Sequence, residues 1–516
     1  MYPPVHAAEA PDRPAMVLAA SGATQTYAEL ADRSARLATW LHRAGLVEGD
    51  RVVLALPNDL RWGEIAWACW RTGLILCAVN WHLSARELTP LMKDAAPRVV
   101  VTSAELDPTL REAAGAAGAG PRFLVVGGGR HDGPDRDDYD ETVQGTEADP
   151  DLPETMGGRL LFSSGTTGRP KPFTVPPPGT HPTEVPVRSG EMMRSLGFEP
   201  GASVYLSTGP AYHAAPLGFL QSVHQLGGTV VLMERFDAEG ALAAIERHGV
   251  THSQWVPTMF VRLLRLPAEV RQRYDLSSHR VAVHGAAPCA PEVKKAIIDW
   301  WGPIVHEYYG ASEGYGRTAI TAEEWLVHPG SVGRPVGGAL HVTDEDGRDL
   351  PVGEVGTVWF VKPDADEPVR GPDGAADLAG TRGWGAVGDL GRLDEDGYLY
   401  LTGRKGQTII SGGVNIYPRE IEDLLVLHPA VADVAVVGVP EEEFGEQVKG
   451  VVQAAEGYEP TPELAAELIA YCRDHLAHFK CPRSIDFTER VPRSDAGKIL
   501  MAELRGRYRA VVPASR

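Results

Sequence analysis

The strongest local signal in the chain is the segment Leu161-Phe162-Ser163-Ser164-Gly165-Thr166-Thr167-Gly168-Arg169-Pro170-Lys171. Glycine lets the backbone come close to a ligand and point successive N–H groups at an anion. Hydroxyl groups and a lysine ammonium add further donors for phosphate oxygens. The spacing of a Walker A loop is absent, and a Ser/Thr/Gly-rich turn alone is most often a plain surface loop. The segment therefore predicts a phosphate-binding loop only if the rest of the chain agrees with it.

Helical and strand patterns alternate on both sides of this loop. Apolar residues recur with helical spacing in residues 27–46 and again in residues 64–76. Residues 52–56 and 98–102 are short apolar runs that predict strands. Helices that alternate with short, fully apolar strands predict an α/β domain in which the strands are buried on both faces.

Later parts of the chain follow other patterns. Residues 114–150 are rich in Gly and Asp and predict surface loop around a strand at 123–126, and residues 340–360 alternate as small antiparallel hairpins do. A separate α+β unit of roughly 110 residues is expected at the C-terminal end. Strands are expected at 229–233, 281–283, 398–402, 431–439 and 485–487, and a helix at 462–476.

Composition indicates an acidic globular protein of more than one domain. The chain has 516 residues and a net charge of −20, a field that disfavours nucleic acid as a partner. Its five cysteines contain no CxxC pair, and the N-terminal residues show no signal-peptide pattern, so we expect a reduced, cytoplasmic protein. Residues 200–233 carry no Asp, Glu, Lys or Arg, but Gly and Pro interrupt them. They predict a buried core segment and no stable membrane insertion.

Six motifs, taken in chain order, resemble the adenylate-forming superfamily of acyl-CoA synthetases, peptide-synthetase adenylation domains and luciferases. An ordered set over nearly the whole chain is far more specific than any one of its members. Besides the loop, the motifs are Gly285-Ala286-Ala287-Pro288, Tyr308-Tyr309-Gly310-Ala311-Ser312-Glu313, the Gly-Asp pair within 384–390, the segment 403–420, and Pro492-Arg493-Ser494-Asp495-Ala496-Gly497-Lys498.

The resemblance implies an enzyme that first joins a carboxylic acid to AMP. A carboxylate is a poor acyl donor, and a mixed anhydride with AMP overcomes this, provided that cations offset the phosphate charge. Tyr309 would stack on adenine, and Asp389 with Arg404 would hold the ribose. Thr167 and Glu313 would hold Mg²⁺, a hard cation that prefers oxygen ligands. The full set of implied nucleotide-binding residues is Ser163, Ser164, Gly165, Thr166, Thr167, Gly168, Lys171, Gly285, Ala286, Ala287, Tyr308, Tyr309, Gly310, Ser312, Asp389 and Arg404.

The same resemblance assigns catalytic and acceptor roles. Lys498 would contact the carboxylate and the α-phosphate during adenylation, with Glu313 as a second catalytic group. The C-terminal domain would then turn about a hinge at Gly406 and Gln407, and Gly412 with Gly413 would admit the thiol arm of CoA. His213 is expected either beside the acyl group or as a plain core histidine.

The sequence departs from the family pattern on the ATP side and at the hinge. Pro172 stands where the family usually has Gly, and proline removes an N–H group and fixes φ. Val387 replaces a common Thr in the ribose motif, and Gly406-Gln407 stands where an acidic hinge residue is expected. These changes raise the hypothesis that adenylation is weak and that a preformed acyl-AMP is the donor.

We therefore expect an α/β protein with an N-terminal AMP-binding domain at 1–403, a hinge at 404–407 and a mobile α+β C-terminal domain at 408–516. The leading interpretation is an acyl-CoA ligase that uses ATP (or acyl-AMP), CoA and Mg²⁺. Its alternatives are the weakly adenylating member, a stand-alone protein that loads a carrier protein, and a nucleotide-binding regulator without chemistry. The expected substrate is an apolar acid of medium-chain, aromatic or alicyclic type rather than an amino acid, with Phe219, Trp255 and Val283 as candidate pocket residues. A homodimer is compatible with this interpretation.

Overall fold

A computed structural model describes residues 1–129, 135–163, 171–310, 314–362, 365, 369–370, 376–377, 383–386, 388–412, 414–441, 443–494 and 497–509. The chain divides into two compact units. The first comprises Met1–Trp255 with Leu266–Ala282, and the second comprises Val256–Arg265 with Val283–Arg516. Among the described residues, no helix has both the length and the apolar character needed to cross a membrane.

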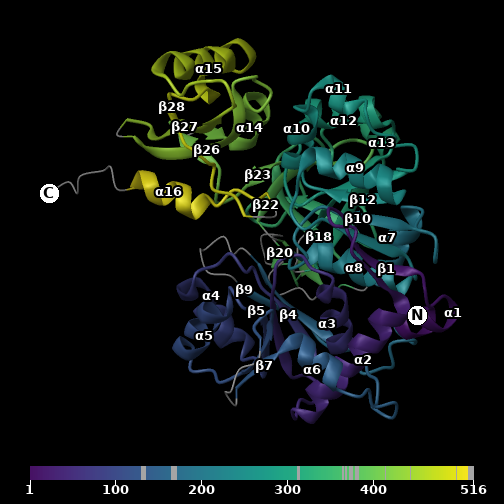
Figure 1. Ribbon diagram of the computed structural model, residues 1–516. Helices are drawn as coiled ribbons and strands as arrows, with labels where there is room; N and C mark the ends of the chain where they lie inside the picture. The colour runs from purple at the N-terminus through teal and green to yellow at the C-terminus, as the bar shows by residue number, and fades with distance from the viewer. Residues whose placement is uncertain are drawn as a thin grey trace. The chain divides into compact units, whose positions relative to one another are not determined.

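A seven-stranded sheet forms one half of the first unit, in the order β7-β6-β5-β3-β4-β8-β9. All neighbouring pairs are parallel except β8 with β9. Helices α4 and α5 cover one face of the sheet and contribute to its apolar core (Figure 1). The strands are β3 (Arg51–Ala55), β4 (Ile75–Ala78), β5 (Val99–Ser103), β6 (Arg122–Val126), β7 (Arg136–Asp138), β8 (Gly158–Ser163) and β9 (Lys171–Val175), and the helices are α2 (Tyr27–Arg43), α3 (Arg61–Trp70), α4 (Ala85–Ala95), α5 (Asp107–Ala116) and α6 (Tyr139–Gly145).

Five further strands of the first unit are hydrogen-bonded in the order β12-β10-β11-β1-β2, as part of a larger sheet. The uncharged residues 200–233 form β10, α8 and β11, and every residue of α8 from Pro216 to Gln225 is buried. A helix that is buried on all sides belongs to a protein core, as expected from the absence of charged residues in this segment. The bounds are α1 (Pro3–Glu9), β1 (Pro14–Leu18), β2 (Thr24–Thr26), α7 (Gly190–Ser195), β10 (Val204–Ser207), α8 (Ala214–Gln225), β11 (Thr229–Leu232), α9 (Ala238–His248), β12 (His252–Trp255) and α11 (Ala268–Arg271).

The second unit begins with the strands and helices that carry the central motifs. Strands β14, β15 and β16 pair in antiparallel fashion, and a smaller antiparallel sheet has the order β17-β18-β22-β23, with β21 paired to β18. The bounds are α10 (Pro257–Leu264), β13 (Val281–His284), α12 (Pro291–Trp301), β14 (Val305–Gly310), β15 (Arg317–Ile320), α13 (Ala322–Val327), β16 (Arg334–Pro335), β17 (Ala339–Thr343), β18 (Gly356–Val361), β19 (Val369–Arg370), β20 (Ala376–Asp377), β21 (Trp384–Gly385), β22 (Asp389–Leu393) and β23 (Leu399–Arg404).

The C-terminal part of the second unit has apolar cores of its own. One core packs α14 and α15 on the sheet β25-β24-β27-β26, and a second packs α16 on β26 through Leu504. Both cores lie between residues 409 and 508, which supports the expected C-terminal domain, while the boundary at 404–407 stays a prediction. The bounds are β24 (Ile409–Ser411), β25 (Val414–Ile416), α14 (Pro418–Leu425), β26 (Val431–Glu441), β27 (Gly445–Ala454), α15 (Pro462–His475), the 3₁₀ turn His478–Lys480, β28 (Ser484–Phe487) and α16 (Met501–Arg509).

Two expectations from the sequence are wrong in detail. The helix expected over 64–76 covers Arg61–Trp70, and Ile75 and Leu76 belong to strand β4. The chain turns between them at Gly73, whose φ is +73°, a conformation that glycine adopts without strain. The loop expected over 114–150 also contains helix α6, which starts behind the Asp138 carboxylate as its N-cap.

Candidate nucleotide-binding and catalytic site

Three of the predicted nucleotide-binding side chains meet in the second unit. Asp389 starts β22 and lies opposite Arg404, the last residue of β23, in the antiparallel ladder. The Arg404 Nε donates to Asp389 Oδ1 at 2.6 Å, and the Tyr309 hydroxyl donates to the other carboxylate oxygen. The structure thus brings together the residues that the resemblance assigns to adenine and ribose.

Asp389 lies in a mostly buried environment beside aromatic rings. Only 7% of Asp389 is exposed, and the Tyr309 ring packs 5.7 Å from the Phe360 ring. A carboxylate can accept about four hydrogen bonds, so the two that it receives leave acceptor sites for hydroxyl groups. Phe360 was not identified from the sequence, because its place beside Tyr309 depends on the packing of strands β14 and β18, which belong to different sheets.

The segment after β13 approaches β14 closely. A Cβ atom on Gly285 would lie 2.8 Å from the Tyr308 carbonyl oxygen, so only glycine fits there without a shift. The next residue, Ala286, has φ of +69° and is exposed. A left-handed non-glycine residue costs roughly 1–2 kcal/mol and is characteristic of functional sites. The following residue, Ala287, is partly buried. Gly310, the last residue of β14, is exposed.

A buried charged cluster fixes β14 from behind. Lys294 Nζ donates to Glu307 Oε2 at 2.7 Å, and both side chains are buried. Burial raises the pKa of Glu307, but the Lys294 ammonium outweighs this effect, and the pKa lies below its ordinary value. Burial lowers the pKa of the adjacent His284 to about 3, so this imidazole is neutral. This cluster was not predicted from the sequence, although Glu307 directly precedes Tyr308 in β14.

Lys498 lies in a short, hydrogen-bonded loop of the C-terminal domain and is exposed. Its backbone is fixed at both ends, because Lys498 N donates to Ser494 Oγ at 3.2 Å and Lys498 O accepts from Ser494 N at 2.7 Å. Gly497 has φ of +77° in this loop, and a Cβ on it would lie 3.5 Å from Thr258 Oγ1 of α10.

The predicted hinge is a hydrogen-bonded turn. Gln407 N donates to Arg404 O at 2.8 Å, and the Gly406 carbonyl accepts from the Arg505 guanidinium of α16 at 2.7 Å. A Cβ at Gly406 would meet no atom within 4 Å, so no steric demand requires glycine there. Gly412 does have a positive φ of +57°, and a Cβ on it would meet the Phe444 ring at 2.8 Å.

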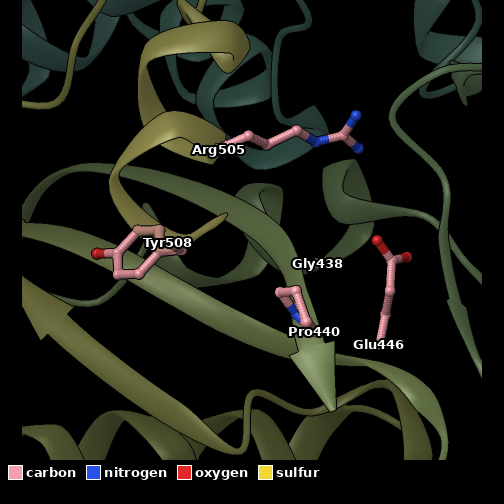
Figure 2. A pocket seen from close by; sticks show the side chains of 5 residues that line it. All are labelled: Gly438, Pro440, Glu446, Arg505 and Tyr508. Atoms are coloured by element: carbon pink, nitrogen blue, oxygen red, sulfur yellow. The ribbon is translucent and has the colours of Figure 1, made fainter. Parts of the chain in front are cut away.

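The cavity beside α16 is not an acyl site. It is lined by Gly438, Pro440, Glu446, Arg505 and Tyr508 and measures about 80 Å³ (Figure 2). Pockets for organic ligands are usually at least about 300 Å³. A larger, open depression is lined by Ala319, Glu324, Arg334, Pro335, Val336, Gly338, Ala339, Leu340, Leu393 and Gly397, and neither hollow is lined by a residue predicted from the sequence.

The remaining predicted residues of the first unit have less defined surroundings. His213 is the N-cap residue of α8 and is partly buried, with its ring centroid 4.5 Å from that of Tyr212. A place beside the acyl group and a plain core role both stay open for it.

The ends of the predicted phosphate loop lie on two paired strands. Ser163 ends β8 and pairs with Lys171, the first residue of β9. Pro172 opposes Phe162 in the same pair, and β9 is the edge strand, where a missing N–H group is tolerated.

Several expectations concern residues outside the described part of the chain. They are Ser164, Gly165, Thr166, Thr167, Gly168, Ser312, Glu313, Val387 and Gly413. The expected Mg²⁺ ligands Thr167 and Glu313 are among them. Across the described residues, no group of three or more His, Cys, Asp or Glu side chains could hold a metal ion.

The chain belongs to the AMP-binding enzyme family. The family model of the AMP-binding enzymes matches residues 4–365, and that of the AMP-binding enzyme C-terminal domain matches residues 420–498. Within this adenylate-forming class, the protein is an AMP-forming acyl-CoA synthetase with a large N-terminal and a small C-terminal α/β domain.

Relatives of known activity resemble the chain over nearly its full length. It is 32% identical to the fatty acid–[acyl-carrier-protein] ligase ScoC of Streptomyces coeruleorubidus, over 98% of this chain and 95% of that protein. It is 33% identical to a feruloyl-CoA synthase of an Amycolatopsis species, over 94% of each chain. The o-succinylbenzoate CoA synthetase of Bacillus subtilis, in complex with its acyl-adenylate, is 25% identical with a TM-score of 0.78, covering 98% of this chain and 97% of that one.

The enzyme converts a carboxylic acid to its CoA thioester through an acyl-adenylate, with ATP and CoA as cosubstrates. The family match and the named synthetases support this complete reaction. They do not favour transfer of a preformed acyl-AMP alone or loading of a carrier protein, the alternatives that the sequence left open. Mg²⁺ is typical of the family and remains an expectation for this chain.

Proposed function

We propose that this acyl-CoA synthetase activates an apolar acid of aromatic or alicyclic type. The feruloyl-CoA synthase that is 33% identical over 94% of this chain supports an aromatic acid. The candidate pocket residues Phe219, Trp255 and Val283 are all apolar and buried in the structure. Apolar walls with a few polar groups are usual for small-molecule sites.

The observation that carries the nucleotide assignment is the convergence of Tyr309 and Arg404 on Asp389. In our proposal Asp389 accepts hydrogen bonds from the ribose hydroxyls, and Arg404 orients its carboxylate through a charge-assisted hydrogen bond. Gly285 and the exposed Ala286 line the adenine and the acyl group, since a backbone without bulky side chains lets planar groups approach closely.

The proposed reaction needs positive charge where the acid meets the nucleotide. ATP supplies the activated α-phosphoryl group, and Lys498 contacts the carboxylate and this group while the anhydride bond forms. Thr167 and Glu313 would hold Mg²⁺, which would offset the negative charge of the phosphates. His213 lies beside the acyl group, and Gly412 with Gly413 admits the thiol of CoA after the C-terminal domain turns about Gly406 and Gln407.

A panel of acids tests the proposed substrate class. Ferulate, benzoate, cyclohexanecarboxylate, octanoate and phenylalanine are each incubated with ATP, Mg²⁺ and CoA, and thioesters are identified by mass spectrometry. We expect the aromatic or alicyclic acids to have the highest kcat/KM. A preference of tenfold or more for octanoate or for phenylalanine would contradict the proposed class. CoA as a sufficient acceptor would separate this enzyme from a carrier-protein ligase.

We also propose a cytoplasmic location and a homodimer. All five cysteines are free and buried, which supports a reducing compartment. Light scattering on the purified chain tests the second proposal, because a monomer of 55.5 kDa differs twofold in mass from its dimer.

A further inference from the structure

We propose that Arg493 is a positioning residue for adenylate formation, because its guanidinium, held by the Asp433 carboxylate, binds the Gly497 carbonyl and so fixes the loop of Lys498. This inference rests on the proposed function of Lys498. Arg493 acts through the loop and does not itself touch the substrate.

The Arg493 guanidinium is anchored by two parallel bonds to one carboxylate. Its Nε donates to Asp433 Oδ2 at 2.8 Å, and its Nη2 donates to Asp433 Oδ1 at 2.8 Å. The Nη2 atom also donates to Val434 O at 3.1 Å. Such bidentate pairs define the orientation of the guanidinium plane, which a lysine ammonium cannot do.

The remaining terminal nitrogen reaches the Lys498 loop. Arg493 Nη1 donates to Gly497 O at 2.7 Å, and this carbonyl belongs to the peptide bond that joins Gly497 to Lys498. The loop is closed by a bridge between Arg493 and Ile499 and by the Ser494–Lys498 backbone bonds. The Arg493 side chain therefore holds the loop from inside, one peptide away from Lys498.

Asp433 provides a rigid base for this arrangement. It lies in β26, which pairs with β27 over nearly its full length, from Val431 to Glu441. The register shifts between Val431 and Asp433, and such irregularities re-aim a side chain at functional positions. Asp433 Oδ1 also accepts from Val434 N at 2.8 Å, which fixes the carboxylate.

Two features distinguish a positioning role of Arg493 from direct phosphate binding and from a purely structural role. Four of the five guanidinium N–H groups donate to protein acceptors, three on β26 and one in the loop, so Arg493 links the loop to β26 and has little capacity left for a phosphate. The ends of the loop are held by an apolar cluster that contains Val491 and Ile499, together with Leu504. We therefore expect the domain to remain folded without the Arg493 guanidinium, and the melting temperature of each variant checks this.

The test measures both half-reactions in the full-length chain. The variants are Arg493→Lys, Asp433→Asn, Lys498→Ala and the double variant of Lys498→Ala with Arg493→Lys, and Arg507→Lys is the control. Arg507 forms an exposed ion pair with Glu503 on α16 of the same domain. Adenylation is followed as acid-dependent pyrophosphate release, and thioester formation as the reaction of synthetic feruloyl-AMP with CoA.

We expect Arg493→Lys and Asp433→Asn to slow adenylation by about 10- to 100-fold, since small misplacements of a reacting group have effects of this size. Thioester formation and the Arg507→Lys variant should stay within twofold of wild type. In the Lys498→Ala background, Arg493→Lys should cause no further loss, because residues that act as one unit are not additive.

Three results would overturn the inference. They are full adenylation by Arg493→Lys, an equal loss in both half-reactions with a lowered melting temperature, or an additive loss in the double variant. If the wild type shows no acid-dependent pyrophosphate release, the proposed function fails and the inference falls with it. The wild type can be active and depend on Lys498 while Arg493→Lys and Asp433→Asn show none of the expected effects. That result would refute the role of Arg493 and leave the proposed function intact.

Discussion

The guanidinium of Arg404 and the carboxylate of Asp389 face each other across the β22–β23 ladder, 2.6 Å apart from Nε to Oδ1. The Tyr309 hydroxyl binds the second oxygen of the same carboxylate. Arg404 ends β23, Asp389 begins β22, and Tyr309 lies in β14 of another sheet. One cation, one anion and one aromatic ring therefore lie in contact.

The first prediction concerns the charge of Asp389. In Asp389→Asn the amide keeps the shape of the side chain but loses its charge, and Arg404 loses its ionic partner. A hydrogen bond to a charged group contributes about 1.5–3 kcal/mol, so kcat/KM for ATP should fall by about 10- to 100-fold. Steady-state kinetics at varied ATP measures this. The control is Asp349→Asn, an exposed residue paired with His341, and equal effects of both variants would refute the assignment.

The second prediction concerns the left-handed backbone of Ala286. Ala286→Val should lower the free energy of unfolding by about 1–2 kcal/mol, because a β-branched side chain tolerates a positive φ poorly. Ala286→Gly should remain within about 0.5 kcal/mol of wild type, since glycine adopts this conformation freely. Urea denaturation compares the two variants. Equal stability of both would show that the backbone is not strained at this position.

The third prediction concerns the buried pair behind β14. Glu307→Gln should lower the free energy of unfolding by about 3–5 kcal/mol, because it leaves the buried Lys294 ammonium without an anion. Adding Lys294→Met to this variant should restore much of the loss. Thermal denaturation of the single and double variants decides the matter, and a double variant less stable than Glu307→Gln would contradict the explanation.

The fourth prediction concerns pH. Burial raises the pKa of Glu422 from 4.5 to about 7, although Glu422 Oε1 accepts from Val436 N and Arg493 lies nearby. A carboxyl group whose pKa is raised by folding stabilises the fold below the ordinary pKa, and this contribution is lost as the pH rises through 7. Wild type should therefore lose stability relative to Glu422→Gln between about pH 5 and 8, by up to about 1.4 kcal/mol per pH unit. Parallel denaturation curves of both proteins across this range would contradict the assignment.

The spacing of apolar residues correctly predicted helix α2 and several buried strands. Helix α2 begins at a capping box formed by Thr26 and Glu29, and its buried face contains Leu30, Leu37 and Leu41. Here the spacing of apolar residues determines which face is buried. The strands β5, β6 and β11 are short apolar runs and were also expected.

The missed boundary lies where two buried elements are separated by a very short connection. Every residue of α3 from Trp62 to Trp70 is buried, and so is all of β4. Periodicity cannot separate a buried helix from a buried strand, and only the short segment Arg71-Thr72-Gly73 marks the turn.

The candidate site was predictable only as far as its motifs are contiguous. Tyr309, Asp389 and Arg404 were identified from their motifs, and the structure brings them together. The contacts that hold them in place, such as Lys294 with Glu307 and Asp433 with Arg493, join residues of ordinary type in distant segments. Nothing in their local sequence indicates a partner, so they follow from the fold alone.

The most direct test of the central claim follows one oxygen atom. The carboxylic acid, labelled with ¹⁸O in both carboxylate oxygens, is incubated with the enzyme, ATP and CoA, and AMP and pyrophosphate are analysed by mass spectrometry. An acyl-adenylate forms when a carboxylate oxygen attacks the α-phosphorus, and the CoA thiol then displaces AMP together with that oxygen. The account predicts one ¹⁸O atom in each AMP and none in pyrophosphate. Unlabelled AMP, or ADP as the product, would contradict it.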